Sequence, residues 1–284
     1  MTESFKRQVR LKEFGISVDR ELAPTSAYLK DTNGTISEGP FRLRTDADGF
    51  IIGPQVEAAQ GPAFYLLGDS FVEASFLPEG KRLTDRLTEL DRDGQQRRFV
   101  NAGYSGATSL NNLSVLINKI LPGDDIGLLY ILPSNDILSL YNYRGFWNRA
   151  DKRYSPLQPI VPETGTGPVP MVENLQQLHA TLAAMAGVAS AFNIRLYFSP
   201  CPFVAVGYED LPWYHNRYRQ PGRYEKLIAD RQKANDVMRS VAARLRVPLI
   251  DLAEHLTDPA LFYDEVHLNE AGSAFAARTI YANL

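Results

Sequence analysis

The sequence is poor in the residues that build disulfide scaffolds and metal centres. Its 284 residues contain a single cysteine, Cys201, and four histidines, at positions 179, 215, 255 and 267. One cysteine excludes an internal disulfide and any cysteine-rich metal site. The histidines do not form the His-Glu-x-x-His pattern of zinc hydrolases. The sequence therefore predicts no metal site.

An excess of basic residues and a long apolar run are also missing. The chain has 30 Lys and Arg against 33 Asp and Glu, so nothing predicts binding to nucleic acid. No apolar run approaches the ~18–20 residues of a membrane span. Residues 1–7 lead into further charge rather than into the apolar region of a signal peptide. As written, the chain is predicted to be cytoplasmic, whereas a removed leader would place it in the periplasm or outside the cell.

From Phe64 onward, short apolar segments alternate with amphipathic ones. The pattern predicts strands at 64–67, 98–101, 126–132, 195–199 and 248–251, and helices at 82–90, 109–120, 171–192, 223–245 and 269–282. Strands that alternate with helices favour a parallel sheet covered on both faces. We therefore predict an α/β fold of three layers, helix, sheet and helix, with five parallel strands.

The first 61 residues differ from this pattern. Turn signals recur at 31–34, 38–40 and 46–49, and the segments 41–45 and 49–52 alternate between apolar and other residues. Few apolar residues are available to bury, so this part is not expected to fold alone. We predict an irregular, β-rich N-terminal extension over residues 1–61, packed on a main domain over residues 62–284.

Candidate catalytic residues follow the predicted strands. Ser70, Gly103 and Asn135 follow the first, second and third strands, and Asp264 and His267 lie between the fifth strand and the last helix. Taken singly, Ser70 is explained as a helix cap, Gly103 and Asn135 as turn residues, and Asp264 and His267 as a pair at a helix start. The carboxyl ends of parallel strands meet at one edge of a sheet, so these residues are expected to converge. Together they supply the hydroxyl, base, carboxylate and oxyanion donors that nucleophilic acyl transfer needs.

Four short motifs at these positions resemble a known family. Gly68-Asp69-Ser70, Asn101-Ala102-Gly103, Ser134-Asn135-Asp136 and Asp264-Glu265-Val266-His267 resemble the four blocks of the SGNH/GDSL hydrolase superfamily, in order. The resemblance covers residues 62–284 and implies a flavodoxin-like fold and an esterase that needs no cofactor. Two positions differ from the family pattern: Phe71 stands where leucine is usual, and Pro133 where glycine is frequent.

The resemblance also implies a role for each matched residue. Ser70 would be the nucleophile and, through its backbone N–H, the first oxyanion donor. Gly103 and Asn135 would be the second and third donors, His267 the general base, and Asp264 the carboxylate that orients it. Pro133 has no backbone N–H and a fixed φ, so the loop that carries Asn135 is expected to have its own shape.

Aromatic residues gather in the two longest loops, which both follow predicted strands. Five of them are candidate substrate-binding residues: Tyr141, Tyr143, Trp147, Trp213 and Tyr214. Aromatic side chains over an active-site edge can stack on sugar rings. They can equally form small cores within the loops themselves.

These observations favour serine-dependent hydrolysis of short acyl esters, with O-acetyl groups on a carbohydrate as the expected substrate. The partner would then be a small-molecule or saccharide ester. One alternative is an O-acyltransferase that passes the acyl group to a sugar hydroxyl. Another is a non-catalytic, carbohydrate-binding relative. A complete set of serine, histidine and aspartate argues against the last, because binding alone does not need all three.

Overall fold

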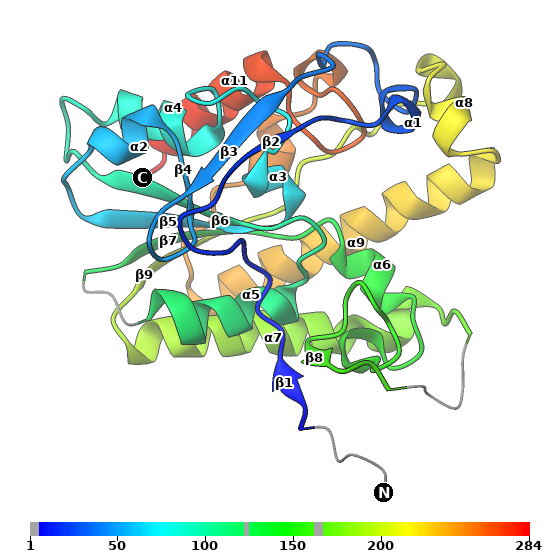
Figure 1. Ribbon diagram of the computed structural model, residues 1–284. Coiled ribbons are helices and arrows are strands. Elements are labelled where there is room, and N and C mark those ends of the chain that lie inside the picture. The colour runs from blue at the N-terminus through cyan, green and yellow to red at the C-terminus, as the bar shows by residue number, and fades with distance from the viewer. Residues whose placement is uncertain (1–5, 122–124, 162–166) are drawn as a thin grey trace, which may run out of the picture.

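A computed structural model describes residues 6–121, 125–161 and 167–284 of the chain. Its centre is a seven-stranded mixed sheet in the order β2-β3-β4-β6-β5-β7-β9 (Figure 1). The strands are β2 (Asp19–Leu22), β3 (Phe41–Thr45), β4 (Ile51–Ile52), β5 (Ala63–Gly68), β6 (Arg98–Gly103), β7 (Gly127–Ile131) and β9 (Arg195–Ser199). A separate two-stranded ribbon pairs β1 (Gln8–Val9) with β8 (Leu157–Gln158).

Helices cover both faces of the sheet, as predicted. Figure 1 shows α4 and α11 on one face and α5, α7 and α9 on the other. The longer helices are α4 (Leu83–Leu90), α5 (Ser109–Val115), α7 (Met171–Ala191), α9 (Pro221–Leu245) and α11 (Glu270–Tyr281). The shorter α-helices are α1 (Ser26–Leu29), α2 (Pro54–Ala58), α3 (Ser70–Glu73), α6 (Asp136–Leu140), α8 (Tyr214–Arg217) and α10 (Leu252–His255). Single turns of 3₁₀ helix occur at Gly145–Trp147, Tyr208–Asp210 and Pro259–Leu261, and a π-helical turn at Leu116–Ile120 continues α5.

The parallel part of the sheet brings the motifs to one edge. β6, β5, β7 and β9 run parallel to one another, and their apolar residues are almost fully buried between the helix layers. The register of β5 and β6 pairs Gly68 with Gly103. The first and second motifs therefore lie side by side at the carboxyl edge of the sheet.

The predicted fifth parallel strand is shorter than expected. Leu249 forms one parallel bridge to Phe198, flanked by hydrogen bonds that Phe198 exchanges with Pro248 and Ile250. Pro248 has no N–H to donate to a ladder. Asp251 already caps α10 by accepting a hydrogen bond from the Glu254 N–H. Backbone chemistry at both ends therefore limits this strand.

The N-terminal extension continues the main sheet. β2 pairs with β3, β3 with β4, and β4 with β6, all antiparallel, and Ile51 lies opposite Asn101. Phe50 packs in the same buried core as the central strands, and Ile51 is also buried. Among the described residues, no helix combines the length and apolar character needed to cross a membrane.

Candidate active site

Ser70 occupies the sharp turn between β5 and α3. Asp69 caps this short helix, since its Oδ1 accepts a hydrogen bond from the Phe71 N–H at 3.0 Å. Gly68 allows the turn because a Cβ there would lie 2.5 Å from Val72 Cγ2 and 3.1 Å from the Ile131 carbonyl oxygen. The N–H of Ser70 falls in the first helical turn, where an N–H has no intrahelical acceptor. It is available for a ligand.

A chain of two hydrogen bonds links Ser70 to His267 and Asp264. Ser70 Oγ lies 2.7 Å from His267 Nε2, and His267 Nδ1 lies 2.7 Å from Asp264 Oδ2. Both distances are within the reach that proton transfer requires. The three residues predicted as nucleophile, base and orienting carboxylate are thus brought together by the fold.

Asp264 is held as a buried carboxylate. Its side chain is only 1% exposed, and Oδ1 accepts hydrogen bonds from the N–H groups of Val266, at 2.9 Å, and His267, at 2.7 Å. Burial alone would raise the pKa of Asp264, but attraction to His267 and these hydrogen bonds outweigh burial and hold the pKa below its usual range. Asp264 therefore stays ionised beside the imidazole.

The environment of His267 favours the protonated imidazole. Burial lowers the pKa of His267, but the negative charge and hydrogen bond of Asp264 outweigh it, so the pKa is raised above its usual value. The Tyr263 ring stacks on the imidazole with an interplanar angle of 10° and a centroid distance of 5.5 Å. A raised pKa makes His267 a stronger base for the Ser70 proton.

Tyr28 is a contact that the sequence did not predict. It lies on α1 in the N-terminal extension, and its hydroxyl donates to Asp264 Oδ2 at 2.8 Å. The extension was expected only to pack on the main domain. A single tyrosine in a polar, turn-rich segment carries no signal that separates such a contact from ordinary packing.

Asn135 is fixed at the end of β7 by Asp69. Its side-chain amide donates to Asp69 Oδ2 at 2.8 Å, and its own Oδ1 lies 3.4 Å from the Tyr154 hydroxyl. Ser134 Oγ also donates to Asp69 Oδ2, at 2.8 Å. An amide nitrogen carries two hydrogens, so Asn135 keeps one for a ligand. Asp69 thereby joins the first and third motifs.

Gly103 has a different environment from the one expected. Its N–H donates to the Asn101 side-chain oxygen at 3.0 Å, so in this structure the N–H is occupied. A Cβ on Gly103 would lie 2.3 Å from the Glu73 backbone nitrogen. The small residue is needed because α3 packs directly on β6. The donor role predicted for Gly103 would require Asn101 to release it.

Gly106 offers another N–H on the same loop. It has φ +77°, and no described residue accepts a hydrogen bond from its N–H. Buried Glu73 accepts from the Ser105 N–H and the Ser75 hydroxyl, which fastens this loop to α3. The sequence analysis predicted a role for neither Gly106 nor Glu73, although a second glycine three positions after Gly103 was a visible signal.

The predicted aromatic residues do not form one group. The Tyr141 hydroxyl donates to Asp230 at 2.6 Å, and Trp213 packs partly buried against the core. Tyr143 and Trp147 are 41% and 53% exposed. The side chain of Tyr214 lies outside what the structure describes. Of the four whose side chains are described, Tyr143 and Trp147 therefore present the most open aromatic surface.

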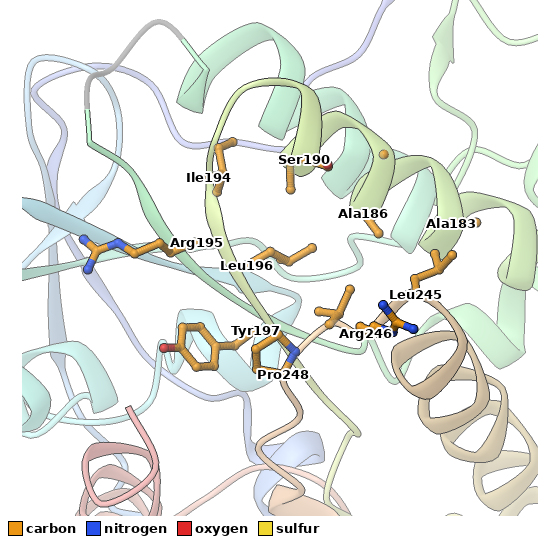
Figure 2. Close-up of a pocket in the computed structure, with 13 residues that line it drawn as sticks. Ala183, Ala186, Ser190, Ile194, Arg195, Leu196, Tyr197, Leu245, Arg246 and Pro248 are labelled. Atoms are coloured by element: carbon orange, nitrogen blue, oxygen red, sulfur yellow. The ribbon is translucent and has the colours of Figure 1, made fainter.

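Three cavities differ in their relation to Ser70. A cavity of about 10 Å³ lies at Ser70 itself, lined by Phe71, Ala74, Leu77, Leu83, Tyr263, His267, Leu268 and Ser273. The Trp147 loop borders a second, of about 340 Å³, together with Leu110 and Leu157. A third, of about 640 Å³, lies at the amino end of β9, where Figure 2 shows Arg195, Tyr197 and Pro248. It is at the opposite end of the strands from Ser70.

Among the described residues, no three acidic, histidine or cysteine side chains cluster as metal ligands would.

Residues 66–275 match the model of the GDSL-like lipase and acylhydrolase family. The chain belongs to this family. Its members hydrolyse ester bonds, and this GDSL-family protein is a hydrolase of that class. No curated protein matches the sequence.

Solved structures share the fold of this GDSL-family protein at low sequence identity. An acetyl xylan esterase, AlAXEase, is 17% identical with a TM-score of 0.53, over 78% of this chain and 98% of its own. The acetyl xylan esterase Axe2 from Geobacillus stearothermophilus is 16% identical with a TM-score of 0.52, over 79% of this chain and 95% of its own. LAE5, an α/β hydrolase from the Lake Arreo metagenome, is 18% identical with a TM-score of 0.53, over 79% and 95%.

Proposed function

We propose that this protein hydrolyses short acyl esters through an acyl-enzyme at Ser70. The hydrogen-bonded chain from Ser70 through His267 to Asp264 carries the proposal. His267 takes the Ser70 proton while Oγ bonds to the ester carbonyl carbon. The tetrahedral intermediate collapses, the alcohol leaves with the proton from His267, and the acyl group stays on Ser70. Water then gives a proton to His267 and attacks the acyl carbon, and Ser70 regains its proton as the free acid leaves.

Three N–H groups would stabilise the oxyanion in this proposal. Two are the backbone N–H of Ser70 and the remaining side-chain N–H of Asn135. We assign the third to Gly106 rather than Gly103, because the Gly103 N–H already donates to Asn101. Preorganised donors of this kind usually contribute about 10²–10³ each in rate.

The acyl group is proposed to be acetyl. The cavity at Ser70 is about 10 Å³ and mostly apolar, which is close to the space that a single water molecule needs. A methyl group is of similar size, whereas a longer chain would displace Leu77 or Leu83. The alcohol is proposed to be a saccharide, which exposed Tyr143 and Trp147 could stack against. The acetyl xylan esterases among the similar structures support the same substrate class.

The test is turnover of p-nitrophenyl acetate by the wild type and Ser70→Ala, with intact-protein mass measured after brief exposure. We expect nitrophenol release and an acetyl adduct in the wild type, and neither in Ser70→Ala. The value of kcat/KM should fall as the acyl chain lengthens from acetate to butyrate to octanoate. Release by Ser70→Ala at the wild-type rate would contradict the mechanism, and equal rates for octanoate would contradict the small acyl pocket.

The same assay separates the two alternatives. With sugar acceptors present, an O-acyltransferase would produce acetylated sugar, whereas a hydrolase would produce acetate. A non-catalytic binding protein would release no nitrophenol and would leave Ser70 unlabelled by a fluorophosphonate.

A further inference from the structure

The N-terminal extension reaches the charged end of the hydrogen-bonded chain. Tyr28 is the only tyrosine among residues 1–61, and it lies before the part of the chain that matches the family, residues 66–275. Thr25 caps its helix by accepting from the Tyr28 N–H at 3.1 Å. The Tyr28 ring packs against Phe76, with a centroid distance of 5.5 Å. Figure 1 shows α1 on the same side of the molecule as α3.

The Tyr28 hydroxyl contacts the carboxylate oxygen that faces the base. It lies 2.8 Å from Asp264 Oδ2, the same oxygen that lies 2.7 Å from His267 Nδ1. It also lies 3.5 Å from Nδ1 itself. Oδ2 therefore has two partners, one from the extension and one from the base.

Packing alone does not account for this tyrosine. A phenylalanine would supply the same ring to the cluster around Phe76, so the hydroxyl is the only part that the packing leaves unexplained. Burial and the nearby Asp264 charge raise the pKa of Tyr28. The hydroxyl thus keeps its proton and remains a donor to Asp264.

The segment after α1 is fastened to the loop that carries Asp264. The Asn33 side-chain amide donates to the Phe262 carbonyl at 2.7 Å, and the Asn33 backbone N–H donates to the Tyr263 carbonyl at 2.9 Å. The extension is therefore joined to this loop directly after α1, five residues beyond Tyr28.

We propose that Tyr28 is a positioning residue for ester hydrolysis, whose hydroxyl holds the Asp264 carboxylate and shares its charge with His267. The proposal rests on the proposed function of Ser70, His267 and Asp264. It makes the N-terminal extension a part of the active site as well as an extension of the sheet.

Other charged or ionisable groups also face His267. They come from every side of the site: Asp264 and Tyr263 on its own loop, Asp69 after β5, Glu73 on α3, Arg217 on α8 and Tyr28 on α1. Loss of the Tyr28 hydroxyl changes one of these and leaves the rest. Without it, the full carboxylate charge acts on His267 and favours the imidazolium further.

The decisive variant is Tyr28→Phe, assayed with p-nitrophenyl acetate across pH. We expect kcat to fall about tenfold with KM nearly unchanged, the size expected for one hydrogen bond to a charged group. The acid limb of kcat/KM should move up by about half a pH unit. Tyr224→Phe is the matched control, because its hydroxyl donates to the Val206 carbonyl at 2.7 Å, apart from the chain of Ser70, His267 and Asp264. It should leave the pH profile unchanged.

A second variant tests whether the extension acts through this hydrogen bond. Asn33→Ala removes the side-chain hydrogen bond from the extension to the Phe262 carbonyl and should lower kcat. In the Tyr28→Phe background, the same substitution should lower kcat little further. A Tyr28→Phe profile that superimposes on the wild type would overturn the proposal. Ser70→Ala is run in parallel: if it stays active, the proposed function itself fails, whereas an inactive Ser70→Ala beside an unchanged Tyr28→Phe refutes only the role of Tyr28.

Discussion

At the scale of single residues, the site depends on how charge is shared around His267. Asp264 is ionised and buried, and it raises the pKa of the imidazole above the usual value. A base with a higher pKa accepts the Ser70 proton more readily, but a larger share of it is already protonated at low pH. Asp264 therefore makes His267 a stronger base and narrows the pH range in which His267 is unprotonated.

This arrangement predicts a pH profile. The proposed mechanism requires the neutral form of His267, and its raised pKa means that protonation begins at a higher pH than for an ordinary histidine. We expect kcat/KM to be constant at alkaline pH and to fall as pH decreases through an apparent pKa above 6.5, the usual value. The measurement is kcat/KM for p-nitrophenyl acetate from pH 5 to pH 9. A limb at or below that usual value would show that Asp264 does not raise the pKa of His267.

Sequence alone located the residues that lie at strand ends and missed those that depend on distant contacts. Ser70, Asn135, Asp264 and His267 each follow an apolar strand or precede the last helix, and a local pattern shows that. Tyr28 meets Asp264 from 236 positions away, and no local pattern records this. The hydrogen bond from the Gly103 N–H to Asn101 was also not predicted, because it depends on the orientation of the Asn101 side chain.

At the scale of elements, the position of Ser70 depends on how α3 sits on β6. Asn101 Nδ2 donates to the Val72 carbonyl at 2.8 Å, and the missing side chain of Gly103 lets the α3 backbone approach. Arg82 adds a buried link, since its guanidinium donates to the carbonyls of Ala74 and Arg42. These contacts fix the helix that begins with Ser70.

Gly103→Ala should therefore harm both stability and turnover. The added Cβ would meet the Glu73 backbone nitrogen at 2.3 Å, and backbone cannot move aside as a side-chain tip can. We expect a lower Tm, with a loss of about 1–3 kcal/mol in the free energy of unfolding, and a lower kcat. Gly187→Ala on α7 is the control, because a Cβ there meets nothing within 4 Å, and it should keep or raise Tm. Equal Tm values for Gly103→Ala and the wild type would refute this account.

Most elements of the main domain could be predicted because periodicity is a local property. The segments 195–199 and 83–90 form a strand and a helix within one residue of the predicted limits. Strand order is not local, so the antiparallel pairing of β4 with β6 was not predicted. The fifth strand was overestimated because an apolar run shows burial but not how many ladder hydrogen bonds form.

At the scale of the whole molecule, the extension and the main domain share one core. The centroid of the Phe50 ring lies 5.2 Å from that of the Tyr65 ring of β5. Lys119 Nζ lies over the Phe50 ring, 4.0 Å from its centroid. We propose that residues 1–61 and 62–284 unfold as one cooperative unit. The pairing of β4 with β6 supports this proposal.

Thermal and urea unfolding of Phe50→Ala test it. We expect one transition in the wild type and one in the variant, with the free energy of unfolding lowered by about 3–5 kcal/mol. Ile16→Ala is the control in the same extension, because Ile16 is 69% exposed and its loss should change stability by less than about 0.5 kcal/mol. Two separate transitions, with only the weaker one affected by Phe50→Ala, would show that the extension is an independent unit.

The contact between Tyr28 and His267 has a consequence for biosynthesis. The two residues are 239 positions apart, and Ser70 and His267 are 197 apart, so the site closes only when nearly the whole chain is available. Contacts of such long range form late in folding, because their loop-closure entropy must be paid first. A ribosome-bound chain that ends before Asp264 holds Ser70 but neither the proposed base nor its carboxylate. Under the proposed mechanism, the nascent protein would be unable to attack esters until the segment that carries Asp264 and His267 has been synthesised.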